Sequence, residues 1–282
     1  MNSLRDLDYA IDLWFREDIG EGDHTTFSTI PEDATGSAKL LVKEKGVLAG
    51  LQVAQRIFNR FDSNILLDPF MEDGSSISPG DVVFLVQGKV HSILQCERLV
   101  LNVMQRMSGI ATTTSAYVSL LEGTGTKVLD TRKTTPGLRL LEKEAVRLGG
   151  GINHRFGLHD MILIKDNHID FAGGIKQAIT STLEYLREQK LDLDIVVEAR
   201  SLEDITAILS NGGVRRILLD NFTVEETREA VRFIDHRVET ESSGGINRNT
   251  IRAYAECGVD YISVGALTHQ IMSLDLSLKA DF

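Results

Sequence analysis

The second half of the chain alternates short apolar runs with segments of helical spacing. Helical patterns separate most of these runs, at 174–189, 202–211 and 223–235. The apolar runs are KVLDT (127–131), MILIKD (161–166), DIVVEA (194–199), RILLDN (216–221), VETESS (238–243) and YISVGA (261–266). Strands that alternate with helices predict right-handed crossovers and a parallel sheet. Because the runs are too few for a regular eight-stranded barrel, we expect a shortened or open α/β barrel.

The first half predicts a small sheet accompanied by helices. Residues 37–50 have a strand–turn–strand pattern, and 65–90 predict short strands broken by Asp-Gly, Pro-Gly and Gln-Gly turns. Helical spacing marks residues 51–61 and a long stretch over 96–121, which joins the two halves. The N-terminal residues predict an amphipathic helix with Ser3 as its N-cap.

Composition and charge argue against several classes of protein. The 282 residues are 42% hydrophobic and 25% charged, and no apolar run approaches the length of a membrane span. We expect a cytoplasmic protein, because the N-terminus lacks a signal-peptide pattern and the distant Cys96 and Cys257 form no metal-binding motif. A net charge of −11 argues against binding to nucleic acid or an anionic membrane.

Positive charge is nevertheless concentrated in one part of the sequence. Between Lys127 and Asp166 there are eight Lys/Arg and five Asp/Glu, whereas the whole chain has 30 and 41. Arg132 and Lys133 stand side by side in DTRKTTPG (130–137), directly after a predicted strand. An acidic chain can bind anions when its cations gather in this way.

Residues with useful chemistry follow most of the predicted strands in this half. The positions just beyond the strands of an α/β barrel line one mouth, so we expect these side chains to meet there. Early strands supply cations, middle strands supply carboxylates, and the last two supply Ser- and Gly-containing loops. In chain order the residues are Arg132, Lys133, Lys165, Glu198, Asp220, Ser243, Gly244, Gly245, Gly265 and Ala266.

The glycine loops and the two carboxylates predict sites for a phosphorylated ligand. Glycines let the backbone approach a phosphate closely, and late barrel strands often bind one. Glu198 and Asp220 suit Mg²⁺ that carries a diphosphate, but they also suit sugar hydroxyls or an internal ion pair with Lys165 or Lys133.

The loop GGGINHRFG (149–157) adds His154 and Arg155 to the expected mouth. An arginine can grip a carboxylate with two hydrogen bonds, and three glycines let the loop fold tightly over a ligand. These residues and the neighbouring cations predict a second anion, a small polycarboxylate. Two such ligands in one cavity indicate group transfer.

Several motifs resemble those of the quinolinate phosphoribosyltransferase family. They are DTRKTTPGLR, GGGINHRFGL, LIKDNH, LLDNF, ESSGGI and GVDYISVGALTH, and they occur in the family's order. The resemblance extends upstream through ERLVLNVMQRMSGIAT (97–112) and EDIGEGDHTT (17–26), so it covers nearly the whole chain. One departure concerns a supporting contact, since Val196 stands where the family often has the first Glu of Glu-Val-Glu, while Glu198 keeps the second.

The resemblance implies a fold, an assembly and a reaction. The fold is an N-terminal α/β sandwich over 1–113, with the tail 270–282 packed back on it, and an open seven-stranded α/β barrel over 114–269. The assembly is a homodimer, or a higher oligomer, in which one subunit's N-terminal domain covers the other's barrel mouth. The reaction is Mg²⁺-dependent transfer of phosphoribosyl from phosphoribosyl pyrophosphate to quinolinate, which yields nicotinate mononucleotide, pyrophosphate and CO₂ for NAD biosynthesis.

The resemblance also implies a role for each candidate residue. The residues that would hold the quinolinate carboxylates are Arg132, His154, Arg155, Lys165 and, from the partner subunit, Arg98. Those that would handle the ribose and the diphosphate are Lys133, Glu198 and Asp220, of which Glu198 and Asp220 would hold the metal. The expected catalytic residues are Lys133, Lys165, Glu198 and Asp220. The expected 5′-phosphate cradle is Ser243, Gly244, Gly245, Gly265 and Ala266.

Other interpretations use some of the same features. A related pyrophosphorylase-like protein of molybdate-transporter operons would use another acceptor, but the full set of acid-binding cations favours quinolinate. A non-catalytic anion-binding module would not need Glu198 and Asp220 together. The turn-rich segment 72–90 resembles a biotinyl or lipoyl carrier, although Lys89 lacks the presentation of a carrier lysine.

Overall fold

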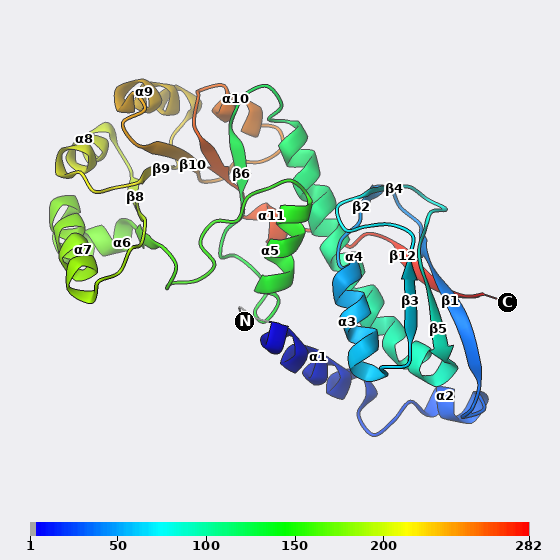
Figure 1. Ribbon diagram of the computed structural model, residues 1–282. Coiled ribbons are helices and arrows are strands. Elements are labelled where there is room, and N and C mark those ends of the chain that lie inside the picture. The colour runs from blue at the N-terminus through cyan, green and yellow to red at the C-terminus, as the bar shows by residue number, and fades with distance from the viewer. Residues whose placement is uncertain (1–3, 282) are drawn as a thin grey trace. The chain divides into compact units, whose positions relative to one another are not determined.

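The computed structural model describes residues 4–281, which form two compact units (Figure 1). The first unit comprises the residues up to Ser115, the segment Thr134–Gly150 and the residues from Leu267 onward. The second comprises Ala116–Lys133 and Gly151–Ala266. Ser3, the expected N-cap, lies outside the described residues.

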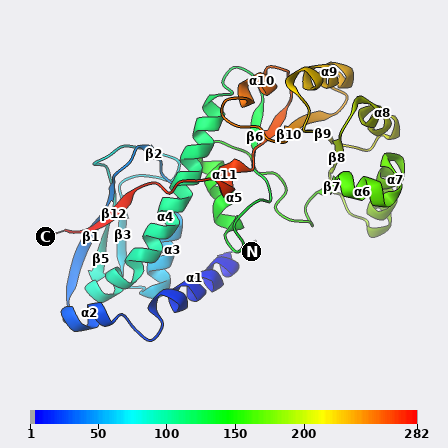
Figure 2. The same cartoon turned by 180° about the vertical axis from the view of Figure 1, so that it is seen from behind.

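The first unit is a mixed α/β layer structure built on an antiparallel sheet of order β12-β1-β5-β3. Helices α1, α3 and α4 lie on one side of this sheet in both views (Figures 1 and 2). Its elements are α1 (Leu4–Ile19), α2 (His24–Thr29), β1 (Thr35–Val42), β2 (Gly46–Val47), α3 (Leu51–Phe61), β3 (Leu66–Pro69), β4 (Ser76–Ile77), β5 (Val82–Lys89), α5 (Arg139–Leu148), β12 (Leu276–Asp281) and most of α4 (Val90–Ser119).

The core of the first unit follows from alternation along β1. Leu40 is buried and pairs with Leu278 of β12 on one side and with Phe84 of β5 on the other. Phe84 meets Phe58 of α3 edge to face, with ring centroids 6.2 Å apart. These contacts bury the apolar face of α3 against the sheet, which is the main source of stability for such a layer.

The second unit is a parallel sheet with helices around it. Its strand order is β6-β11-β10-β9-β8-β7, and helices α7, α8 and α9 follow one another along the outside (Figure 1). Its elements are β6 (Lys127–Leu129), β7 (Ile162–Ile164), α6 (Asp166–Ala172), α7 (Ile175–Gln189), β8 (Ile195–Ala199), α8 (Leu202–Asn211), β9 (Arg216–Asp220), α9 (Val224–Ile234), β10 (Glu239–Ser243), α10 (Ile251–Ala255), β11 (Tyr261–Ser263) and the start of α11 (Ala266–His269).

The connections between these strands confirm the predicted βα alternation. Every residue of β8 is buried, as expected for a parallel strand that is covered on both faces. Helix α9 begins with a capping box, in which the Thr223 and Glu226 side chains each bond the other's backbone N–H. Each cap fixes where a helix leaves the sheet edge, so the loops after the strands have defined positions.

The structure has six strands in this sheet, where the family resemblance implied seven. Ile152 adds one parallel bridge to Leu129 of β6, beyond the named strands. The first strand, β6, pairs with the last, β11, which is the neighbour order of a barrel. The pairings establish a parallel sheet, and the open barrel stays a prediction. Within residues 4–281 every helix is too short or too polar to span a bilayer.

Candidate active site

The carboxyl ends of β7 and β8 bring a lysine and a carboxylate together. Lys165 follows β7 directly, and its Nζ lies 3.4 Å from Oε1 of Glu198 in β8. Oε2 of Glu198 accepts the backbone N–H of Asp166 at 2.9 Å, so both carboxylate oxygens have partners. The Lys165 side chain is 47% exposed and that of Glu198 only 8%. The amine is therefore accessible to a ligand while the carboxylate beneath it is fixed.

Asp220, the last residue of β9, carries a charge that its surroundings disfavour. Burial raises the pKa of Asp220, and the negative charges of Glu198 and Asp166 raise it further against the opposing charge of Lys165. Nδ2 of Asn221 donates to its Oδ2 at 2.8 Å. A cation bound next to Asp220 and Glu198 would relieve this repulsion.

The donor set fits Mg²⁺ as a metal that arrives with substrate. Within residues 4–281 no three His, Cys, Asp or Glu residues gather as a metal-binding group. Mg²⁺ usually keeps several waters and binds one or two carboxylates together with substrate phosphates. Glu198 and Asp220 provide two such carboxylates at neighbouring strand ends.

Arg132 and Arg155 converge from adjacent loops of the sheet edge. The bridge between Ile152 and Leu129 makes these loops begin side by side. Burial lowers the pKa of Arg155, and the positive charge of Arg132 lowers it further against the opposing negative charge of Asp160, so Arg132 acts on Arg155 across the two loops. Nη1 of Arg155 donates to the carbonyl oxygen of Met161 at 3.3 Å. Two cations held together against their repulsion indicate an anion-binding site.

The loop after β10 has a backbone conformation that lets other groups approach its main chain closely. Gly244 and Gly245 have φ angles of +99° and +62°, which favour glycine. A Cβ at Gly244 would collide with the side chain and backbone nitrogen of Asn221. The carbonyl oxygen of Ser243 accepts the Asn221 N–H at 2.9 Å, which fixes the start of the loop.

Three more of the expected residues lie in the second unit. Gly265 and Ala266 follow β11, and their loop starts beside that of Ser243 because β11 pairs with β10. Lys133 is exposed, and its backbone N–H donates to Oγ1 of Thr131 at 3.0 Å. Arg98 instead belongs to the first unit, where it is an exposed residue of α4 and takes part in no ion pair among the described residues.

His154 lies deeper than its glycine-rich loop suggested. Its side chain is 7% exposed, with Nε2 3.4 Å from Oε2 of Glu241. Its Nδ1 accepts the backbone N–H of Arg155 at 2.7 Å, and its own backbone N–H donates to Oδ1 of Asp130 at 2.7 Å. Both ring nitrogens therefore face protein groups.

Sequence reasoning missed three carboxylates of this region, Asp130, Asp166 and Glu241. Asp130 and Asp166 stand within two residues of the predicted site cations Arg132 and Lys165. Glu241 lies two residues before Ser243, so both side chains project from the same face of β10. A charged residue inside an otherwise buried strand was the signal that could have identified Glu241.

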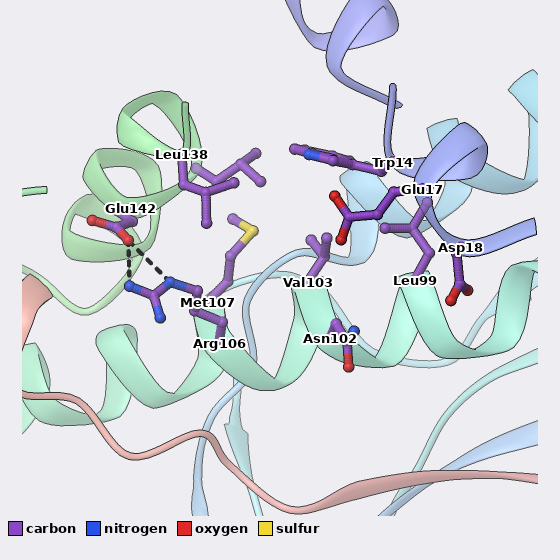
Figure 3. Close-up of a pocket in the computed structure, with 11 residues that line it drawn as sticks. Trp14, Glu17, Asp18, Leu99, Asn102, Val103, Arg106, Met107, Leu138 and Glu142 are labelled. Carbon is purple, nitrogen blue, oxygen red and sulfur yellow. Dashed lines mark hydrogen bonds and ion pairs between the residues drawn. The ribbon is translucent and has the colours of Figure 1, made fainter. Parts of the chain in front are cut away.

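A pocket of about 290 Å³ lies within the first unit. Figure 3 shows the Trp14 ring across the pocket from side chains of α4, and the ion pair between Arg106 and Glu142 at one side. The pocket is lined by Trp14, Glu17, Asp18, Leu99, Asn102, Val103, Arg106, Met107, Leu138, Leu141 and Glu142. None of the predicted site residues lines it, so we place the candidate chemistry at the strand ends of the second unit.

Comparison with known proteins agrees with the motifs. Residues 23–108 match the N-terminal domain of quinolinate phosphoribosyl transferase and residues 110–279 match its C-terminal domain. The chain is 43% identical to quinolinate phosphoribosyltransferase [decarboxylating] 1b of Nicotiana tabacum over 98% of its length and 83% of that protein. It is 39% identical to the probable nicotinate-nucleotide pyrophosphorylase [carboxylating] of Bacillus subtilis over 99% of its length and 94% of that protein.

A solved structure gives the same result for the fold. The nicotinate-nucleotide pyrophosphorylase from Francisella tularensis superposes with a TM-score of 0.94 at 38% identity, covering 100% of this chain and 98% of the other. Sequence and structure therefore agree over both units. The chain belongs to the quinolinate phosphoribosyltransferase family.

Proposed function

We propose that this protein transfers the phosphoribosyl group of phosphoribosyl pyrophosphate to quinolinate and decarboxylates the adduct, giving nicotinate mononucleotide, pyrophosphate and CO₂ for NAD biosynthesis. The observation that carries the proposal is the shared strand edge at which paired arginines, Lys165, two carboxylates and glycine loops occur in one family member. The arginines suit a dicarboxylate, whereas the carboxylates and glycines suit a metal-bound, phosphorylated sugar.

Quinolinate would bind on the cationic side of this edge. Arg132, Arg155 and Lys165 neutralise its two carboxylates and direct its ring nitrogen toward C1 of the ribose. A bound dianion would oppose the repulsion between Arg132 and Arg155.

Phosphoribosyl pyrophosphate would bind on the other side. Lys133, Glu198 and Asp220 contact the ribose and the diphosphate, and Ser243, Gly244, Gly245, Gly265 and Ala266 surround the 5′-phosphate. Glu198 and Asp220 would hold Mg²⁺ together with the diphosphate, and the metal would supply positive charge to the leaving group.

The reaction requires the protein to position the two substrates and to stabilise developing charge, and it needs no covalent intermediate with the protein. As the bond from C1 to pyrophosphate breaks, the ribose carbon becomes cationic, and the buried carboxylate of Glu198 favours that charge. Attack by the ring nitrogen makes a pyridinium. Its positive charge accepts the electrons of the adjacent C–CO₂⁻ bond, so CO₂ leaves and a proton takes its place on the ring.

The experiment is to incubate the protein with Mg²⁺, phosphoribosyl pyrophosphate and carboxyl-labelled quinolinate and to measure released CO₂ and nicotinate mononucleotide. We expect both products in equal amounts. Arg132→Ala should raise the quinolinate KM by about tenfold or more, the loss expected for a charged hydrogen bond. Absence of both products, or unchanged kinetics for this variant, would contradict the assignment.

We propose further that the protein works as a homodimer, or as a higher oligomer, in which Arg98 completes the site of a partner subunit. The exposed position of Arg98 and its lack of an ion-pair partner within residues 4–281 support this. Arg98→Ala and Lys165→Ala should each be inactive, and mixed subunits should recover part of the activity. Subunit exchange confirmed by labelling, without recovery, would refute the shared site.

The cytoplasm stays our prediction for the compartment. Both cysteines are buried free thiols, which suits a reducing environment. Fractionation of the native host with an antibody to this chain would test it.

A further inference from the structure

A buried charged network lies in the strands below the candidate site. Nη1 of Arg216 donates to Oε2 of Glu241 at 2.9 Å, and its Nε and Nη2 donate to Oε2 of Glu239 at 3.2 Å. Its guanidinium also stacks on the ring of Tyr261, 3.9 Å from the centroid. Glu241 is completely buried. Burial of a charged group is costly, so its retention calls for a specific reason.

Strand register connects Glu241 with the site. Glu241 lies opposite Leu218, which lies opposite Glu198, so these three side chains project from the same face of the sheet. Ser243, two residues later, lies opposite Asp220 in the next row. Glu241 is therefore in the same row as Glu198 and one row below Asp220 and Ser243, at which the glycine loop begins.

The contacts of Glu241 favour its charged form, and they leave one of its two carboxylate oxygens without a hydrogen bond. Burial alone raises the pKa of Glu241, but the hydrogen bond from His154 and the hydrogen bond and charge of Arg216 lower it below its ordinary value. Its Oε2 faces both of those partners, whereas its Oε1 has no hydrogen-bond partner within residues 4–281. A full negative charge thus lies under the loop that carries Arg155.

The hydrogen bonds of His154 define the state of its ring. Because Nδ1 accepts the Arg155 N–H, the proton of a neutral ring resides on Nε2, where it faces Glu241. The backbone of His154 is anchored to Asp130. Two buried carboxylates therefore hold the His154–Arg155 segment, one through the backbone and one through the imidazole.

We propose that Glu241 is a positioning residue of the dicarboxylate site, which acts by fixing the Nε2–H tautomer of His154 and so holding Arg155 beside Arg132. In this arrangement His154 supports the arginines and does not itself bind the acceptor. The inference rests on the proposed function for its kinetic consequence only, since the tautomer is a property of the protein alone.

The first test needs no activity. Two-dimensional ¹H–¹⁵N NMR of the histidine side chains, with His154 assigned by comparison with His154→Gln, reports which ring nitrogen carries the proton at neutral pH. We expect Nε2–H with an unprotonated Nδ1. An Nδ1–H or doubly protonated ring would overturn the proposal, whether or not the protein transfers phosphoribosyl.

The second test is kinetic, with Glu241→Gln and Ser242→Ala as matched variants. Ser242 is the next residue of β10, is buried and has an unpartnered hydroxyl, but it projects from the opposite face. Glu241→Gln should raise the quinolinate KM about tenfold and change that for phosphoribosyl pyrophosphate less than about twofold, whereas Ser242→Ala should change neither. A double variant Glu241→Gln/His154→Gln should be no worse than the more impaired single variant.

Equal changes in both KM values, an unaltered quinolinate KM, or additive effects in the double variant would show that Glu241 acts only on the general fold. Wild-type protein without transfer activity would refute the proposed function instead and leave the tautomer measurement to decide this inference.

Discussion

Replacing Asp220 with Asn should stabilise the free protein while it impairs the reaction. The amide keeps an oxygen that can accept the hydrogen bond of Asn221, but it removes a charge that burial and the neighbouring carboxylate of Glu198 disfavour. Substitutions that remove an unfavourable charge commonly stabilise a protein by about 1 kcal/mol. For a chain of this size that corresponds to an unfolding midpoint roughly 2–4 °C higher.

The sign of the pH dependence follows from the raised pKa of Asp220. Its folded-state pKa lies above the unfolded value near 4, so the charged form costs stability at every pH above the folded pKa. The advantage of Asp220→Asn should therefore be complete at neutral pH. It should shrink as the pH falls through the folded pKa and vanish below about pH 4, where both states of the wild type are protonated.

Glu198→Gln is the matched control, since this carboxylate has an N–H donor and a lysine as partners. It should lower the midpoint at neutral pH or leave it unchanged, the opposite trend to Asp220→Asn. Differential scanning fluorimetry between pH 4 and 8 gives both comparisons, and addition of Mg²⁺ with phosphoribosyl pyrophosphate should raise the wild-type midpoint more than that of either variant. A less stable Asp220→Asn at neutral pH would refute the electrostatic reasoning.

Two further predictions concern glycine geometry and the first unit. Gly244→Ala should lower the free energy of unfolding in urea by more than about 2 kcal/mol and weaken phosphoribosyl pyrophosphate binding, because its Cβ meets Asn221. The control Gly245→Ala has open space around the Cβ and should lower the free energy of unfolding by only about 1 kcal/mol. Asp8→Asn should cost about 0.5 kcal/mol at pH 7, because the hydrogen bond from Arg56 lowers the pKa of Asp8. That loss should disappear as the pH falls below about 4 and then through the lowered folded pKa, which urea titrations at pH 7 and pH 2.5 would show.

The pattern of apolar residues predicted the regular elements well and the short ones poorly. Helices α8 and α9 lie within a residue of the predicted 202–211 and 223–235, because amphipathic periodicity runs along each helix and a Ser or Thr N-cap marks its start. Helix α6 was missed because Asp166–Ala172 is a single short segment after a strand. Helix α5, over Arg139–Leu148, belongs to the first unit although it lies between two strands of the second in sequence, an assignment that periodicity cannot supply.

The candidate site shows the same limit at the level of single side chains. Strand-end positions predicted which residues would share an edge, and Lys165, Glu198 and Asp220 do interact there, because the ends of parallel strands are neighbours whatever their sequence separation. The position of a residue just after a strand does not, however, determine how deeply its side chain is buried. His154 and Arg155 both follow the bridge residue Ile152 and both are largely buried, and Nε2 of His154 lies 3.4 Å from Oε2 of Glu241 on β10. A carboxylate inside a strand therefore carries information that strand-end positions lack, because Glu241 is the buried partner of the His154 ring.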